Sequence, residues 1–471
     1  MSLVVETPPG RAAERGYVLG VVLGDRLGLD WRLEQSGRAD VRLRFDADPA
    51  GPAVTMPDTL LGIPEEEWLT PASLRADPPA TLPVDDPGST SLTAGQRVPL
   101  LLGPAAADGP LVTFGPRGAR LSLDVFGTAF FMLTRYEEAV LPDRDTWNRF
   151  PAAASAVDRA GMLRTPVVDV AVELLWSALE RVWPRLRRRT GPGYRVLLTH
   201  DVDDPLSTLG RGPLDVAHQF AADLVLRRDP GLAARRARAL LRMRSDHTGD
   251  PHDTFDLLMD VSERHSLASA FYLQSHERAD PGGGAPYALT HPRIVDLMRR
   301  VHVRGHELGY HAGFGTYRDA GRTAAEFARL RGAARTLGID QERWGGRQHY
   351  LQWDPTATWR NWADAGLDHD CTVAYADAVG FRTGTSHEFP VFDLAAGRPL
   401  PLRERPFQVM DVTLSGYLGL TPDAAADEVL AIAAECRRYG GTLGLLWHND
   451  TLRGSRTKRW YAALVAAVSA G

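Results

Sequence analysis

From residue 194 onward, short apolar runs alternate with longer segments whose apolar residues recur at helical spacing. The runs predict strands and the longer segments predict helices. The predicted strands are Arg195–Thr199, Ser269–Leu273, His306–Tyr310, Gly345–Tyr350, Cys371–Ala374, Gln408–Thr413 and Thr442–Trp447. The predicted helices are Thr254–His265, Pro292–Arg304, Ala324–Leu337, Thr356–Ala365, Asp423–Tyr439 and Lys458–Ala470. This alternation indicates a parallel α/β sheet. The close spacing of the predicted strands along the chain fits a closed or nearly closed barrel better than an open sheet.

Residues 1 to about 190 follow a different pattern, with many Pro, Gly and Asp residues and only short apolar runs. Helical spacing appears over Asp124–Val140 and over Pro166–Arg187, whose arginine-rich end suits a helix C-terminus. The basic run Arg187–Arg189, followed by Thr-Gly-Pro-Gly, makes a natural boundary. We therefore predict a smaller α+β domain over residues 1–190 and an α/β domain over residues 191–471.

Composition narrows the class of protein. The 471 residues are 44% hydrophobic and 24% charged, as in soluble globular proteins, and the net charge of −5 gives no sign of a nucleic-acid partner. The sequence shows no run long enough to span a membrane and no recognisable leader, so we expect a cytoplasmic protein. The two cysteines, Cys371 and Cys436, argue against a disulfide framework and against a cysteine-based zinc site.

The first candidate for chemistry is an acidic strand end at residues 199–204, Thr-His-Asp-Val-Asp-Asp. Side chains alternate along a strand, so Asp201 and Asp203 share one face. One carboxylate can hold a divalent cation while the other acts as a base. The alternative is that these residues cap the next helix or form a turn.

The second candidate is His311, at the end of Gly305-His-Glu-Leu-Gly-Tyr-His. The two histidines are five residues apart, not four as in the zinc proteases. In an extended chain His311 points into the site and His306 points away as a packed or hydrogen-bonded support. His311 is then a metal ligand; the alternative is an ordinary structural histidine.

Two further strand ends carry charged or titratable groups. Arg347 and His349 share one face of Gly346-Arg-Gln-His-Tyr, and an arginine beside two aspartates can hold one of them ionised. His448 follows a strongly apolar strand, where it is placed to act as a general acid. The alternatives are a salt bridge at the core edge and a histidine at a loop start. Either Asp370 or Asp411 would orient His448.

Together these residues suit metal-assisted hydrolysis, which needs a cation, a base, a charged residue that keeps the base ionised, and an acid. Glycine-rich phosphate loops and a Gly-x-Ser-x-Gly elbow are absent from the sequence. Weaker candidates for substrate contact are Arg382, which would bind an anionic group or form a surface salt bridge, and Asp450. Trp447 and Trp353 would stack on a sugar ring or pack in the core, whereas we expect Trp359 to be a core residue.

The order of these motifs resembles the polysaccharide deacetylase superfamily (NodB-homology, carbohydrate esterase family 4). Thr199–Asp203, Gly305–His311, Arg347–Tyr350 and Leu446–His448 look like its motifs, and the resemblance covers about residues 194 to 470. Residues 1–190 resemble the uncharacterised N-terminal region that precedes this domain in some bacterial relatives, notably at 124–131 and 135–138.

The resemblance implies a distorted (β/α)7 barrel that removes acetyl groups from sugars with a divalent metal, zinc being the expected ion. Asp201 would be the base that deprotonates the water on the metal, with Arg347 as its tether. Asp203 and His311 would be metal ligands. His448 would protonate the departing amine, and a backbone N–H near Tyr350 would stabilise the oxyanion together with the metal.

The sequence departs from the family pattern at two positions. The second metal histidine is expected four residues after His311, where the chain has Gly315, and His349 stands where a proline is usual. Our hypothesis is that His349 replaces the lost ligand. Asp203 and His311 alone would bind a metal weakly, because catalytic zinc normally has three protein ligands.

The leading interpretation is a metal-dependent hydrolase that removes an N-acetyl group from a sugar or a sugar-containing substrate. Because we expect a cytoplasmic location, a precursor is favoured as the substrate over a finished wall polymer. The same residues would serve a hydrolase of a different amide. A non-catalytic carbohydrate-binding pseudoenzyme is the third interpretation, and Gly315 is its best support.

Overall fold

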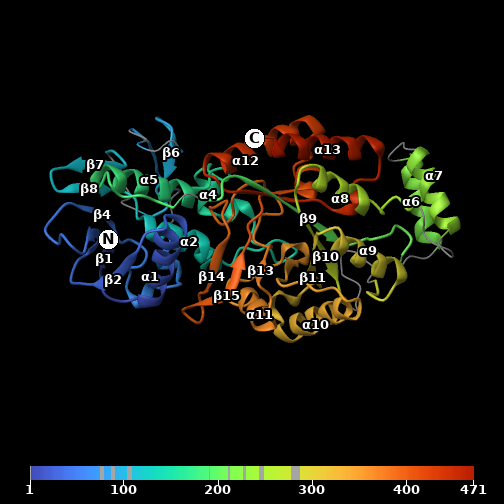
Figure 1. Cartoon of the computed structure of the whole chain (residues 1–471), viewed down its shortest axis with the longest axis horizontal. Helices are drawn as coiled ribbons and strands as arrows, with labels where there is room; N and C mark the ends of the chain where they lie inside the picture. Colours follow the sequence, from blue (N-terminus) through green and yellow to red (C-terminus); the bar gives the residue numbers. More distant parts are fainter. Residues whose placement is uncertain are drawn as a thin grey trace.

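The computed structural model describes residues 2–74, 79–85, 88, 91–102, 109–189, 191–209, 213–225, 230–242, 249–276 and 287–470. Two main sheets use different parts of the chain (Figure 1). The first has the order β2-β1-β3-β4-β8-β7, and β5 pairs with β6 in a separate ribbon. The bounds are β1 Leu3–Thr7, β2 Trp31–Gln35, β3 Asp40–Phe45, β4 Ala53–Pro57, β5 Thr81–Pro83, β6 Arg97–Pro99, β7 Val112–Gly115 and β8 Gly118–Leu121.

The second sheet has nine strands in the order β14-β15-β13-β12-β11-β10-β9-β17-β16. All neighbours are parallel except β14 and β15. The bounds are β9 Arg195–Val202, β10 Ser269–Gln274, β11 Glu307–Ala312, β12 Gly345–Gln348, β13 His369–Asp370, β14 Phe389–Asp393, β15 Arg398–Glu404, β16 Val409–Met410 and β17 Thr442–Leu446. The prediction of a parallel α/β sheet is confirmed. Since β14 and β16 end the order of the described strands, the sheet is a curled half-barrel and the closed barrel stays a prediction.

Helices cover both sheets. Near the first sheet lie α1 (Ala12–Leu19), α2 (Val125–Leu133), α3 (Tyr136–Val140), α4 (Ala156–Arg159) and α5 (Val167–Val182). Around the second lie α8 (Phe255–Arg264), α9 (Pro292–Val303), α10 (Ala320–Thr336), α11 (Thr358–Ala365), α12 (Pro422–Arg438) and α13 (Ser455–Ser469) (Figure 1). The one helix predicted over Asp124–Val140 is broken, because Arg135 has a left-handed backbone with φ +53°. None of the described helices is long and apolar enough to cross a membrane.

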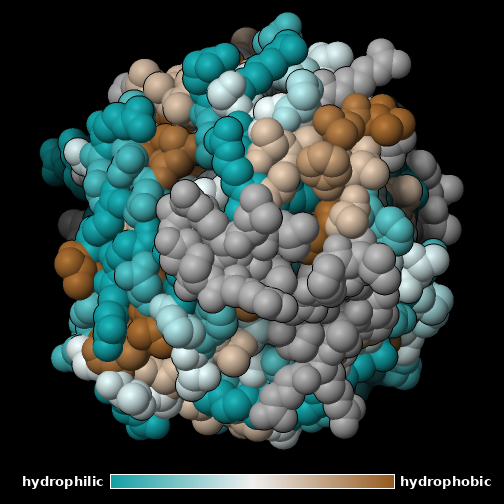
Figure 2. Space-filling view, turned by 90° about the vertical axis from the view of Figure 1, so that its right-hand side faces the viewer, coloured by the Kyte–Doolittle hydropathy of each residue, from teal (hydrophilic) through white to brown (hydrophobic). Residues whose placement is uncertain are grey.

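Two helices, α6 (Pro213–Val225) and α7 (Pro230–Arg242), lie at the far end of the molecule (Figure 1). Figure 2 looks at this end: the apolar side chains that are coloured there lie in small groups among hydrophilic ones. On α6, Leu224 and Val225 are exposed. Groups of this kind are ordinary on protein surfaces, and the residues that carry chemistry lie instead at the strand ends of the second sheet.

One buried apolar cluster includes residues from both parts of the chain. Phe130 of α2 packs edge-on against Phe392 of β14, with ring centroids 5.4 Å apart, and Tyr17 of α1 also contacts Phe392. The two sheets are therefore packed against a shared set of side chains. The division of the chain at residue 190 stays a prediction.

Several predicted elements differ from those observed. The strand predicted at Cys371–Ala374 is a loop, and the strand is instead the two residues of β13. The strand predicted at Gln408–Thr413 shortens to β16 and continues into a π-helix at Thr413–Tyr417. Strands β14 and β15 were not predicted, because Pro399 and Pro401 argue against a strand in β15.

Candidate metal and catalytic site

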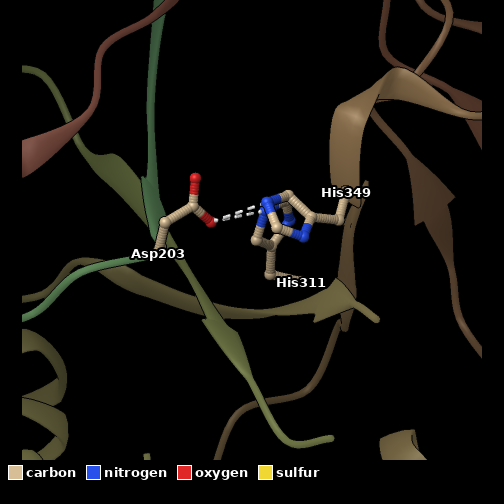
Figure 3. Close-up of side chains that lie close together, drawn as sticks. All are labelled: Asp203, His311 and His349. Carbon is tan, nitrogen blue, oxygen red and sulfur yellow. Dashed lines mark ion pairs between the residues drawn. The ribbon is translucent and has the colours of Figure 1, made fainter. Parts of the chain in front are cut away.

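Asp203, His311 and His349 converge on one point from the ends of three strands of the second sheet (Figure 3). Asp203 directly follows β9, His311 lies in β11, and His349 directly follows β12. Asp203 Oδ1 lies 3.0 Å from His311 Nε2 and 3.4 Å from His349 Nε2. Two atoms that each lie about 2.0–2.1 Å from a tetrahedral zinc are about 3.4 Å apart. The three side chains are thus spaced as the ligands of one cation.

The hydrogen bonds of His311 test whether these residues fit a metal. Its Nδ1 lies 3.0 Å from the carbonyl oxygen of Arg347, which can only accept, so Nδ1 carries the hydrogen. A neutral ring then turns the lone pair of Nε2 toward the carboxylate of Asp203, and this buried Nε2 has no hydrogen-bond partner among the residues that the structure describes. Metal-bound histidines have this arrangement, with the second ring nitrogen donating to a carbonyl. One carboxylate and two imidazoles form a donor set that suits zinc.

Gln274, the last residue of β10, holds the carboxylate of Asp203. Its Nε2 donates to Asp203 Oδ1 at 2.9 Å. The sequence analysis missed this residue, although it directly follows the predicted strand Ser269–Leu273. Because the ends of parallel strands meet at one edge of the sheet, the polar side chain at the end of this strand could have identified Gln274 as a site residue.

Asp201 is held beside the three converging residues by Arg347. Arg347 Nη1 donates to Asp201 Oδ1 at 2.6 Å, while Nη2 donates to Thr199 and Nε to the carbonyl of Cys371. Burial raises the pKa of Asp201, but the charge of Arg347 outweighs burial and leaves the pKa below its ordinary value. The second oxygen, Oδ2, lies 3.8 Å from His311 Nε2. Asp201 is therefore an ionised carboxylate with one oxygen turned to the site.

His448 faces the same carboxylates from the end of β17. Its Nδ1 lies 2.7 Å from Asp411 Oδ1, and its backbone N–H donates to Asp411 Oδ2 at 3.0 Å. Burial lowers the pKa of His448, but the carboxylate of Asp411 and then those of Asp203 and Asp201 raise it to about 10. His448 Nε2 lies 3.7 Å from Asp203 Oδ2, so a protonated nitrogen faces the site. Of the two aspartates considered for orienting His448, the structure places Asp411 there.

A pocket of about 200 Å³ opens over these groups. Its lining residues are Arg149, Asp201, Asp203, His349, Tyr350, Leu351, Met410, Val412, Tyr417, Leu446 and His448. Tyr350 and Leu351 both have left-handed backbones, with φ of +59° and +57°, which turn the chain sharply after His349. The sequence analysis missed Arg149 and Tyr417. Arg149 lies about two hundred residues before His349, and no sequence motif connects these two residues.

Three residues predicted to contact substrate do not line this pocket. Arg382 is buried and donates to Glu138 at 2.5 Å, so it belongs to an internal ion pair. The Trp447 ring packs against Trp460 and Tyr461 of α13, because the residue before His448 points to the opposite face of the chain. Asp450 pairs with Arg453 at 2.7 Å. Asp450 also belongs to a second group of candidate ligands, with Asp204 and His252.

Gly315, which stands where the family pattern has a histidine, is held in a conformation that favours glycine. Its φ is +81°, and its backbone N–H donates to Gln352 Oε1 at 2.8 Å. His306 behaves as the predicted support, since its Nδ1 accepts the backbone N–H of Ser269. The structure therefore brings Asp201, Asp203, His311, Arg347, His349, Tyr350 and His448 together at one pocket.

Residues 3–184 match the model of a family of unknown function, DUF7033. A comparison with curated proteins gave no match. Among solved structures, the chain is similar to a putative polysaccharide deacetylase from Mycobacterium smegmatis, with 18% identity and a TM-score of 0.39 over 60% of this chain and 87% of that one.

Two further structures are similar at lower identity. A family 4 carbohydrate esterase from Streptomyces lividans in complex with acetate has 12% identity and a TM-score of 0.29, over 59% of this chain and 91% of that one. A mutant of a CE4 family pseudoenzyme with restored enzymatic activity has 9% identity and a TM-score of 0.31, over 62% and 68%. Since the TM-scores lie below 0.5, the function of this chain has to be inferred from its own site.

Proposed function

We propose that the protein is a metal-dependent hydrolase that removes an N-acetyl group from a sugar or a sugar-containing substrate. The convergence of Asp203, His311 and His349 on one point, with an ionised Asp201 and a protonated His448 beside it, supports this proposal. The order of the motifs along the chain supports the more specific parts of the proposal, namely that the acyl group is acetyl and that the substrate contains a sugar.

A divalent cation bound here would polarise the acyl carbonyl and favour attack by water. Asp201 accepts the proton of the attacking water on its free oxygen, Oδ2. Arg347 keeps Asp201 ionised and oriented through its bond to Oδ1. Backbone N–H groups near Tyr350 serve as the donors for the negative charge that develops on the carbonyl oxygen.

His448 completes the reaction by donating the proton on Nε2 to the departing nitrogen. The C–N bond then breaks, and the products are acetate and a free amine. Asp411 holds the ring through Nδ1 and stabilises its protonated form before this transfer. A purely binding site needs neither a base nor an acid, so Asp201, Arg347 and His448 count against the pseudoenzyme interpretation.

Two measurements on the purified full chain test the proposal: elemental analysis for bound metal, and acid release from N-acetylated amino sugars. One metal per chain with release of acetate supports the proposal. Bound metal with release of a different acid favours the second interpretation, hydrolysis of another amide. No metal and no turnover supports a pseudoenzyme.

A substitution separates the base from the metal ligands. Asp201→Asn keeps the size of the side chain, so we expect the metal to remain bound while turnover falls by about a hundredfold or more. His302→Ala, in the last turn of α9, is the control and leaves both unchanged. Full turnover in Asp201→Asn contradicts the assignment of the base.

A further inference from the structure

A segment that precedes the nine-stranded sheet forms part of the pocket wall. The ring of Trp147 stacks on that of Tyr350, with centroids 4.7 Å apart and an angle of 16°. Gln352 Nε2 donates to the carbonyl of Trp147 at 2.8 Å. These contacts fix residues 145–149 to the loop that carries His349, and Arg149 lines the pocket beside it.

The guanidinium of Arg149 pairs with Asp145 through two nitrogens. Nε donates to Asp145 Oδ2 at 2.7 Å, and Nη2 lies 2.6 Å from the same oxygen and donates to the Tyr417 hydroxyl at 2.8 Å. Nη1 donates no hydrogen bond to any residue that the structure describes. Arg149 is only 6% exposed and lines the pocket.

A charged donor on a residue that lines the pocket can serve a bound molecule, and a charged acceptor gives the strongest bond. The carboxylates on the pocket floor already have other partners: Asp201 pairs with Arg347, and Asp203 with the histidines. Arg149 and Asp203 line the same pocket of about 200 Å³, so a substrate whose acyl group lies at Asp203 has Arg149 on the wall of the same pocket. An arginine stays charged at every working pH and matches the geometry of carboxylate and phosphate.

We propose that Arg149 binds an anionic substituent, a carboxylate or a phosphate, on the same sugar unit that carries the acyl group. The preferred substrates are then acidic N-acyl amino sugars. This inference rests on the function proposed above and adds the substrate class. It moves the recognition of an anion from Arg382, where the sequence suggested it, to a residue of the amino-terminal part of the chain.

A purely structural explanation is that Arg149 ties residues 145–149 to Tyr417. The two explanations differ in their dependence on the substrate. A clamp affects every substrate equally, whereas an anion-binding residue affects only the acidic ones. Tyr417→Phe removes the clamp and keeps the charge, so it is expected to retain the preference for acidic substrates.

The test compares three sugars that share one ring: N-acetylglucosamine, N-acetylmuramic acid, which adds a carboxylate, and N-acetylglucosamine 6-phosphate. With the full chain, kcat/KM for one of the acidic sugars is expected to exceed that for the neutral sugar. Arg149→Gln lowers this acidic kcat/KM by about tenfold to a hundredfold and leaves the neutral one nearly unchanged. Arg149→Lys retains part of the preference. Which acidic sugar responds distinguishes carboxylate from phosphate.

Arg159→Gln is the matched control, because Arg159 is an exposed arginine of the same region that donates to the carbonyl of Ala154. It is expected to leave the preference unchanged. Equal kcat/KM for all three sugars, or an equal loss for all three in Arg149→Gln, overturns the inference. Should no sugar release acetate, the proposed function fails, and calorimetric Kd values for the same sugars with wild type and Arg149→Gln decide the role of Arg149 separately.

Discussion

Asp411 contacts His448 twice, through Oδ1 to Nδ1 at 2.7 Å and through Oδ2 to the backbone N–H. The carboxylate therefore both orients the ring and stabilises its protonated form. Asp411→Asn keeps the shape and removes the charge, so we expect kcat to fall by about tenfold to a hundredfold with the metal content unchanged. Thr451→Val, which removes another hydrogen bond to Asp411, is the control and lowers kcat less. An unchanged kcat in Asp411→Asn argues against His448 as the acid.

The proposed third ligand is tested by His349→Ala. The variant leaves Asp203 and His311 as the only members of the trio, so we expect zinc affinity to fall by more than the roughly tenfold to hundredfold lost when an outer-shell partner is removed. Equilibrium dialysis with zinc measures the change. His302→Ala on α9 serves as the control. If the variant keeps the metal content of the wild type, the idea that His349 replaces the lost histidine is wrong.

Gly315 is expected to matter for stability and not for the metal. Because its backbone is left-handed, Gly315→Ala lowers the free energy of unfolding by about 1–2 kcal/mol. Gly332→Ala is the matched control: Gly332 lies within α10 with open space around it, and alanine there stabilises the helix. Chemical denaturation of both variants, with metal analysis, checks this. A loss of metal in Gly315→Ala shows that this position still contributes to the site.

The ion pair between Glu138 and Arg382 connects α3 to the loop before β14. Both side chains are almost fully buried, and Glu138 also accepts from Arg135. Glu138→Gln leaves the buried Arg382 without its charge partner, so we expect a loss of about 3–5 kcal/mol in the free energy of unfolding. Glu65→Gln, which changes an exposed carboxylate paired with Arg11, is the control and changes it by less than about 1 kcal/mol. Similar losses in the two variants contradict this prediction.

Asp370 and Glu404 are buried carboxyl groups on adjacent strands, directly opposite in register. Burial raises the pKa of Asp370 to about 7, and burial together with the charge of Asp370 raises that of Glu404. At these two groups the folded chain therefore binds more protons than the unfolded chain. It follows that their contribution to the free energy of unfolding falls as the pH rises from about 4 through about 7.

Asp370→Asn removes one member of this pair. We expect the difference in free energy of unfolding, variant minus wild type, to increase as the pH rises, and to reach at pH 8 a gain on the order of 1–3 kcal/mol over the wild type. Urea denaturation between pH 5 and pH 8 measures both, and Asp364→Asn, at an exposed position of α11, is the control. If the free energy of unfolding depends on pH in the same way in wild type and in Asp370→Asn, a titration shared by Asp370 and Glu404 is ruled out.

The sequence predicted those parts of the site that depend on local pattern. Strand alternation placed Asp201 and Asp203 on one face, and apolar runs located His311 and His448 at strand ends. Arg149 and Trp147 were missed because their contacts to Tyr350 and Tyr417 join segments far apart in the chain. Arg382 was assigned to substrate because its buried partner, Glu138, also lies far away in sequence.

The prediction of the fold from the sequence was limited in the same way. Apolar runs found β9, β10, β11 and β17, whose residues are buried on both faces. They failed at Cys371–Ala374, where side chains replace the partners of a strand: Glu404 accepts the N–H of Val373, and Thr372 accepts that of Gln348. The cytoplasmic location and the boundary at residue 190 stay predictions.

The left-handed backbone at Tyr350 and Leu351 makes the position of His349 depend on contacts from elsewhere in the chain. Residues with side chains avoid this conformation, at a cost of about 1–2 kcal/mol each, so the turn persists only where neighbours hold it. Trp147 and Gln352 are those neighbours. The position of His349 in the proposed cation site thus depends on a stretch of chain that precedes the whole half-barrel, so a substitution of Trp147 would disturb a candidate ligand about two hundred residues away.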